Sequence, residues 1–191
     1  MSDDDERVMA LDLPEADDDP GIAGYYAKCE ERLGLVPNVL RAFATRPEKF
    51  RTFTAFYNEL MLGESSGLSK LEREMIAVVV SSANRCLYCL VAHGQAVRKL
   101  SGDPVLGDQL ALDHTKAALS ERHRAMLDFA WKLAERPQAV DEADRERLRA
   151  AGFGEADIFD IADVAAFFAY SNRMAHALDL RPNREYYGMD R

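Results

Sequence analysis

The sequence has few cysteines and no long apolar run, and each shortage removes a class of protein. Three cysteines in 191 residues are too few for a disulfide-stapled scaffold, and a chain of this length does not need one to hold its core. No run of about 18 apolar residues is present, so we expect no membrane span. The composition that remains, 48% hydrophobic and 30% charged residues, is typical of a globular protein.

Positive charge is also in short supply. The chain has 24 Lys and Arg against 33 Asp and Glu, which gives a net charge of −9. Residues 1–20 hold nine acids and one base, so most of this charge lies in the first segment. Nucleic-acid binding needs a basic surface, and we therefore expect no nucleic-acid partner. The acids, with Pro14 and Pro20, predict a flexible or loosely docked lead-in. An acidic start is unlike a secretory or mitochondrial address, so a cytoplasmic location is expected.

An alternating strand pattern is missing as well, whereas helical spacing of apolar residues runs through most of the chain. The sequence thus predicts an all-α fold, a multi-helix bundle in a single domain over residues 21–191. Ser69 and Glu72 form a capping box that opens a helix with Leu71, Met75 and neighbouring valines on one face. The predicted helices span residues 23–33, 39–45, 47–62, 70–83, 86–100, 120–136, 141–150 and 156–180.

One helix face presents a column of reactive side chains. At about 100° per residue, Cys86, Cys89 and His93 fall within an arc of roughly 60° on the helix that follows a break at Asn84-Arg85. We expect Cys86 in the first turn of that helix. The free backbone amides there, together with the Arg85 charge, favour a thiolate. Such a thiol pair can carry out nucleophilic attack and disulfide exchange.

A carboxylate twelve residues earlier belongs to the same pattern. In one continuous helix, Glu74 would lie about 18 Å from Cys86, too far to act with it. If the chain reverses at residues 84–85, the two helices form an antiparallel hairpin that brings Glu74 level with His93. A carboxylate that orients a histidine, which in turn serves a thiol, is the arrangement of covalent catalysis. The spacing therefore predicts a Glu74–His93 proton relay beside the cysteines.

The pattern of Glu74, Cys86, Cys89 and His93 resembles the alkylhydroperoxidase D-like proteins of the carboxymuconolactone decarboxylase superfamily, and most closely their uncharacterised peroxidase-related branch. The resemblance implies a peroxidase-type dithiol oxidoreductase in which Cys89 attacks a hydroperoxide and Cys86 closes the disulfide. It also implies a homo-oligomer, trimer-based or hexameric, and no bound cofactor. An external lipoyl-type dithiol would be the reductant, and a peroxiredoxin or lipoyl protein a possible partner. Some better understood members have a second histidine directly before the second cysteine, where this chain has Tyr88.

Two other functions remain open from the sequence alone. The pair could be the switch of a non-enzymatic redox sensor or interaction module. The same side chains are also acceptable zinc ligands, which would make the chain a metal-binding helical domain. A structural zinc site usually has a second ligand pair, however, and the remaining cysteine and histidines are scattered. Of these we expect Cys29 to be an inert helix residue and His176 to be packed in the core or an interface.

Overall fold

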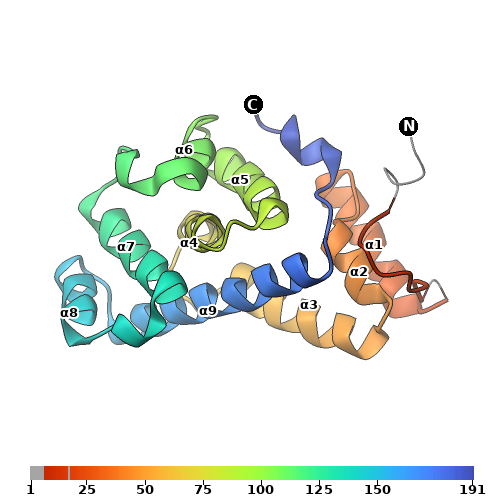
Figure 1. Ribbon diagram of the computed structural model, residues 1–191, viewed down its shortest axis with the longest axis horizontal. Helices are drawn as coiled ribbons and strands as arrows, with labels where there is room; N and C mark the ends of the chain where they lie inside the picture. Colours follow the sequence, from red (N-terminus) through yellow and green to blue (C-terminus); the bar gives the residue numbers. More distant parts are fainter. Residues whose placement is uncertain (1–6, 17) are drawn as a thin grey trace.

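The computed structural model describes residues 7–16 and 18–191, and these residues form helices and no strand (Figure 1). The prediction of an all-α fold is therefore confirmed. None of the described helices is both long enough and apolar enough to cross a bilayer. The α-helices are α1 (Pro20–Leu33), α2 (Asn38–Ala44), α3 (Pro47–Leu62), α4 (Lys70–Ala83), α5 (Leu87–Ser101), α6 (Leu106–Asp113), α7 (Glu121–Glu135), α8 (Glu142–Ala150) and α9 (Glu155–Ala177); short 3-10 turns are η2 (His114–Lys116), η3 (Pro137–Ala139) and η4 (Arg184–Tyr187).

Helix α4 is the centre of the molecule. Figure 1 shows it end-on, with α5, α6, α7 and α9 arranged around it. Every residue from Glu72 to Ser81 is buried. Burial therefore extends beyond the predicted apolar face, because neighbouring helices cover the helix on all sides. Its start agrees with the prediction, since the Ser69 and Glu72 side chains form the reciprocal capping bonds.

Helix α6 has no counterpart among the predicted helices. It follows the break at residues 101–104 and packs closely on α5. A Cβ atom at Gly107 would lie 2.6 Å from the carbonyl oxygen of Gly94, so only glycine permits this approach. Leu110 of α6 is fully buried. The helix is short and has no side-chain cap, which explains why local pattern alone did not reveal it.

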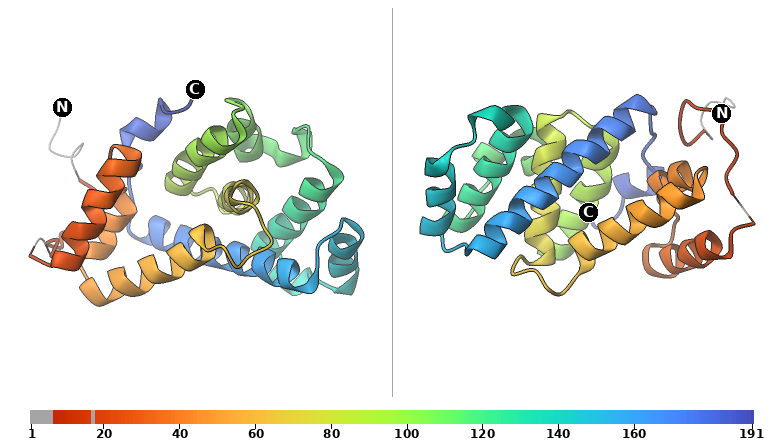
Figure 2. Two further views of the ribbon diagram at one scale, coloured as in Figure 1. Left: turned by 180° about the vertical axis from the view of Figure 1, so that it is seen from behind. Right: turned by 90° about the horizontal axis from the view of Figure 1, so that it is seen from below.

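Helices α1, α2 and α3 form a limb beside the bundle, as the two views of Figure 2 show. Aromatic rings join this limb to α9. Phe43 of α2 stacks on Phe53 of α3 with ring centroids 4.1 Å apart, and Phe53 lies 5.6 Å from Phe167 of α9. Such ring contacts add to the apolar area that they bury. They anchor the limb on α9.

The acidic lead-in is only partly described, because residues 1–6 and 17 lie outside the described residues. The part that is described contacts the end of α9 and the segment after it. The backbone N–H of Ala10 donates to Leu178 at 2.8 Å, and that of Arg181 donates to Val8 at 3.0 Å. Met9 between them is buried. Residues 8–10 are thus docked on the C-terminal part of the chain.

The chain reverses at Asn84-Arg85 through a Schellman motif. The N–H of Cys86 donates to Ser81 at 2.9 Å and that of Arg85 donates to Ser82 at 3.0 Å. This motif needs a left-handed residue, usually glycine, and here Arg85 takes it with φ 55°. A side chain with a Cβ atom is strained in that conformation. The reversal sets α5 against α4 and so fixes which residues of the two helices face each other.

We expect Arg85→Gly to stabilise the protein, because glycine adopts positive φ without strain. The free energy of unfolding should rise by about 1 kcal/mol, measured by urea denaturation. Arg85→Ala removes the same charge but keeps the Cβ atom, so it should give no gain. Equal stability of the two variants would contradict strain at this position.

Candidate active site

The hairpin brings the predicted carboxylate and imidazole together. Glu74 of α4 and His93 of α5 are joined by a hydrogen bond of 2.6 Å between Oε2 and Nδ1. Both side chains are nearly buried, with exposed fractions of 10% and 12%. A buried carboxylate needs such a partner to offset its lost hydration. The bond fixes the ring orientation and leaves Nε2 as the nitrogen that can exchange a proton.

A second contact holds the same ring from the side. The edge of Phe168 in α9 meets His93, with centroids 4.6 Å apart and planes at 79°. Phe168 is itself almost fully buried. The imidazole is therefore clamped between a carboxylate and an aromatic ring, and its rotation is restricted.

The two cysteines lie at the start of α5. Cys86 is the N-cap residue, one position before the first turn in which we expected it, and Cys89 lies within that turn. Their exposed fractions are 2% and 1%, and both are free thiols. His93 follows Cys89 by one turn on the same helix face. Glu74 and His93 thus meet across α4 and α5, whereas Cys86 and Cys89 pack in a cluster with Met9, Ala42 and Ala175.

The sulfur atoms share their protons unequally. A hydrogen bond from the Cys89 thiol lowers the pKa of Cys86 to about 6, and the backbone N–H of Cys89 and the charges of His176 and His93 act in the same direction. The pKa of Cys89 is raised well above its ordinary value by its hydrogen bond to Cys86 and by burial. Near neutral pH, the pair therefore holds one thiolate and one thiol.

Helix α9 supplies polar partners for Cys89 that the sequence analysis missed. Hydrogen bonds from Ser171 and Asn172 favour the thiolate of Cys89 and oppose part of the rise in its pKa. Asn172 is fully buried. Its amide donates to Ser81 at 3.0 Å and accepts from Asn84 at 3.0 Å. Ser171 and Asn172 interrupt the apolar sequence of α9, and this interruption was the one sign in the sequence that they have a polar partner.

Two further side chains near the cysteines also have defined contacts. The hydroxyl of Tyr88 accepts a hydrogen bond from the backbone N–H of Val39 at 3.0 Å. It therefore caps α2, which has no side-chain cap of its own. His176 is exposed, and its Nε2 lies 2.9 Å from the carbonyl oxygen of Asn84. His176 therefore does not pack in the core, because the end of α9 is open to solvent above the hairpin turn. A place at an interface between chains stays a prediction.

A cavity of about 510 Å³ opens onto these residues. Glu74, Cys89 and His93 line it, whereas Cys86 does not. This wall comes from α4, α5 and α9. The opposite wall comes from α1, α2 and α3 and includes the aromatic rings of Tyr25, Phe53 and Tyr57. The volume is that of a pocket for a small organic molecule, and the sulfur it reaches is that of Cys89.

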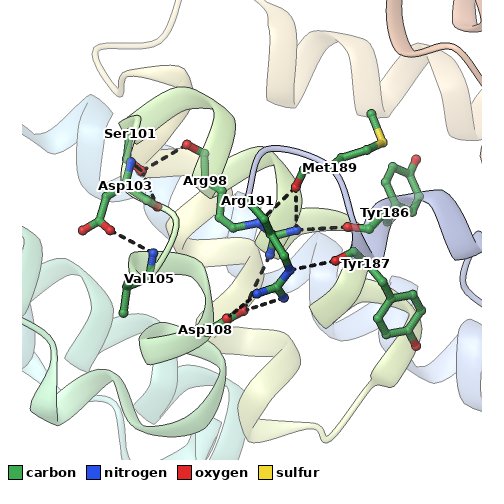
Figure 3. A network of polar contacts seen from close by, with 9 residues as sticks. All are labelled: Arg98, Ser101, Asp103, Val105, Asp108, Tyr186, Tyr187, Met189 and Arg191. Carbon is green, nitrogen blue, oxygen red and sulfur yellow. Dashed lines mark hydrogen bonds and ion pairs between the residues drawn. The ribbon is translucent and has the colours of Figure 1, made fainter.

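The C-terminal segment closes one side of the cavity through Tyr186. Figure 3 shows how Arg98 of α5 holds this segment. The buried guanidinium of Arg98 donates to the carbonyl oxygens of Tyr186 at 3.0 Å and Met189 at 3.1 Å. Gln95, also in the cavity wall, donates to Asp190 at 2.5 Å. These bonds tie the last residues of the chain to the helix that carries the cysteines.

A metal site finds no support in this geometry. Among residues 7–16 and 18–191, no group of three or more His, Cys, Asp or Glu side chains is arranged to hold an ion. Glu74 and His93 are bonded to each other, and Cys86 and Cys89 interact as a pair. The arrangement is suited instead to thiol chemistry with proton transfer.

The geometry agrees with what comparison with known proteins gives. The family model for the carboxymuconolactone decarboxylase family matches residues 47–105, which include the whole hairpin. A solved uncharacterized peroxidase-related protein from Silicibacter sp. TM1040 is 56% identical, with 97% of each chain covered and a TM-score of 0.94. A peroxidase-related protein with an alkylhydroperoxidase AhpD core from Ralstonia eutropha JMP134 is 44% identical, with 97% of each chain covered and a TM-score of 0.92.

The chain therefore belongs to the alkylhydroperoxidase D-like proteins of the carboxymuconolactone decarboxylase superfamily. The same fold extends to more distant proteins. The debrominase Bmp8, solved with 2,3,4-tribromopyrrole, is 20% identical over 95% of this chain and 94% of its own, with a TM-score of 0.78. No curated protein matches the sequence significantly.

The unequal sharing of protons can be tested by titrating the thiols. In a Cys29→Ser background, the ultraviolet absorbance of the thiolate should rise as the pH increases through about 6. Cys89→Ser keeps a hydroxyl donor toward Cys86, so the pKa of Cys86 should stay lowered. Cys89→Ala removes the donor, and the pKa should move up toward the ordinary thiol value. The same titration curve for both variants would exclude the hydrogen bond as the cause.

Proposed function

We propose that this protein is a thiol-dependent reductase of hydroperoxides that uses the pair Cys86 and Cys89. One observation carries the proposal. The only cavity-lining sulfur of the pair, Cys89, shares its wall with a histidine held by a buried carboxylate at 2.6 Å. This is the arrangement of a nucleophile, a base and a group that orients the base. Membership of a family with peroxidase-related relatives supports it.

The reaction begins with a proton shift inside the pair. Transfer across the hydrogen bond between the sulfur atoms turns the Cys86 thiolate and Cys89 thiol into a Cys86 thiol and a Cys89 thiolate. The Cys89 thiolate then attacks the outer oxygen of the hydroperoxide, the O–O bond breaks, and Cys89 becomes a sulfenic acid. The leaving alkoxide takes a proton from His93, which Glu74 holds in position, and departs as the alcohol.

Two further steps return the protein to its starting state. The Cys86 thiol condenses with the sulfenic acid, which forms the disulfide and releases water. An external dithiol then reduces this disulfide and leaves as its own disulfide, and one of the protons it supplies returns to His93. The net change is one hydroperoxide and one dithiol converted to one alcohol, one water and one disulfide.

Access rather than acidity decides which sulfur attacks. Cys86 has the lower pKa, but it does not line the cavity, and Cys89 does. Ser171 and Asn172 favour a thiolate on Cys89 once the proton has moved to Cys86. The assignment of attack to Cys89 and of disulfide closure to Cys86 is part of the proposal. So are a lipoyl-type dithiol as reductant, a peroxiredoxin or lipoyl protein as partner, and a homo-oligomeric state.

A redox sensor is the main alternative, since the same pair could oxidise without turnover. The large cavity beside Cys89 favours the enzyme, because a sensor needs no pocket of this size. Stoichiometric oxidation without repeated consumption of peroxide would instead favour the sensor.

Thiol counting tests the central claim. In a Cys29→Ser background, one equivalent of cumene hydroperoxide should remove two titratable thiols, because both sulfurs enter one disulfide. With dihydrolipoamide present, peroxide consumption should continue over many turnovers. Cys89→Ser should abolish turnover, and Cys86→Ser should stop at a sulfenic acid that a dimedone probe traps. Full turnover by Cys89→Ser would rule the mechanism out.

Loss of the carboxylate tests the relay. Glu74→Gln should lower kcat/KM by about a hundredfold, mainly through kcat, because the imidazole loses the carboxylate that orients it for proton transfer. Glu72→Gln, a second buried carboxyl on the same helix that pairs with Arg122 at 3.1 Å, should reduce stability and leave the kcat of the folded protein unchanged. Unaltered turnover of Glu74→Gln would refute the relay.

A further inference from the structure

The substrate class can be inferred from the wall that faces the cysteine, and this inference rests on the proposed function. The cavity volume of about 510 Å³ greatly exceeds the space that hydrogen peroxide needs, since one water molecule takes up about 30 Å³ in the liquid. Phe53, Tyr57 and Phe167 line the cavity and contact one another. A surface of this kind binds an organic body rather than a small polar oxidant.

Two cations stand in the same wall. Lys28 and Arg32 lie one turn apart on α1, both are exposed, and both line the cavity. Neither makes an ion pair with any residue that the structure describes. The neighbouring acids Glu30 and Glu31 are not part of the cavity wall. The chain as a whole is negative, with a net charge of −9, but the cavity wall on α1 carries two positive side chains that no acid neutralises.

The positive charge of Arg32 extends into the cavity. Burial raises the pKa of the Cys29 thiol and of the Tyr25 hydroxyl, and the positive charge of Arg32 opposes the rise at both. Both residues line the cavity. The Tyr25 hydroxyl donates to Oδ1 of Asn58 at 2.8 Å, which leaves the amide N–H groups of Asn58 available to a ligand. The α1 and α3 wall therefore offers positive charge and hydrogen-bond donors.

The wall formed by α4, α5 and α9 has no charged group that is free to bind a ligand. Its one carboxylate, Glu74, is bonded to His93. The fixed charge that remains for a ligand is thus positive and lies on the limb, across the cavity from Cys89. From this placement we propose that the substrate is an organic hydroperoxide with a carboxylate remote from its O–O bond. The carboxylate binds Lys28 and Arg32, the apolar body lies on the aromatic wall, and the peroxide group reaches Cys89.

A matched pair of substrates tests the proposal. Cumene hydroperoxide and its para-carboxylated derivative differ only in the charge, and dihydrolipoamide, which is neutral, serves both as reductant. The wild-type protein should prefer the carboxylated compound in kcat/KM by roughly tenfold, mainly through KM, the combined effect of two partly exposed ion pairs. Added salt should weaken the preference. Lys28→Gln with Arg32→Gln should remove the preference by raising the KM of the carboxylated compound to that of cumene hydroperoxide.

A charge-matched control separates this effect from net charge. Lys49→Gln with Lys116→Gln removes two exposed cations outside this cavity and should keep the preference. A wild-type protein that treats both hydroperoxides alike, or a preference that survives in the Lys28 and Arg32 variant, would overturn the proposal. A charge preference confined to dihydrolipoate over dihydrolipoamide would also overturn it, because the cations would then serve the reductant.

Binding of unreactive analogues keeps this test independent of the proposed function. Cumyl alcohol and its para-carboxylated derivative can be titrated into the protein by calorimetry. Tighter binding of the carboxylated alcohol, lost in the Lys28 and Arg32 variant, supports the inference even if neither hydroperoxide is consumed. In that case the peroxidase proposal alone would fail.

Discussion

The site depends on one hydrogen bond between a carboxylate and an imidazole, both of which are nearly buried. Glu74 lies in the most deeply buried helix of the molecule, and its carboxylate is bonded to His93 at 2.6 Å. A carboxylate left unpaired at this depth would be costly, so the bond orients the imidazole and also makes the burial of α4 possible. The carboxylate and the imidazole come from different helices, and the bond forms only because the chain reverses at Arg85. The Schellman turn, the burial of α4 and the bond between Glu74 and His93 therefore depend on one another.

Some of this could be predicted from the sequence because it follows from local geometry. The helical repeat alone places Cys86, Cys89 and His93 on one helix face. A turn at residues 84–85 is then enough to bring Glu74 opposite His93. What could not be predicted depends on segments far apart in the chain. Asn172 reaches Cys89 from α9, and Tyr88 caps α2 through Val39. The spacing of residues in the sequence does not reveal either contact, because each depends on how the helices pack. Helix α6 was missed for the same reason.

The cavity divides into two walls with different tasks. Helices α4, α5 and α9 provide the Cys89 thiol, the bonded pair of Glu74 and His93 and the polar partners of Cys89, whereas α1, α2 and α3 provide aromatic rings and two cations. A change in the limb can alter which molecule is bound without moving a reacting atom. A debrominase at 20% identity has the same fold, and the fold therefore does not fix the substrate. The substrate has to be inferred from the limb of each protein, as the cations on α1 allow here.

The ends of the chain close the structure around this cavity. Residues 8–10 pair with the segment after α9, and Asn183 accepts from the N–H of Asn38 at 2.7 Å at the start of α2. Arg98 binds the carbonyl oxygens of the last turn from within α5. Since Tyr186 lies between these two anchors and lines the cavity, the C-terminal segment connects the limb to the hairpin of α4 and α5. These hydrogen bonds act together with the ring contact between Phe53 and Phe167. The two walls of the cavity are thus joined both through the C-terminal segment and through α9.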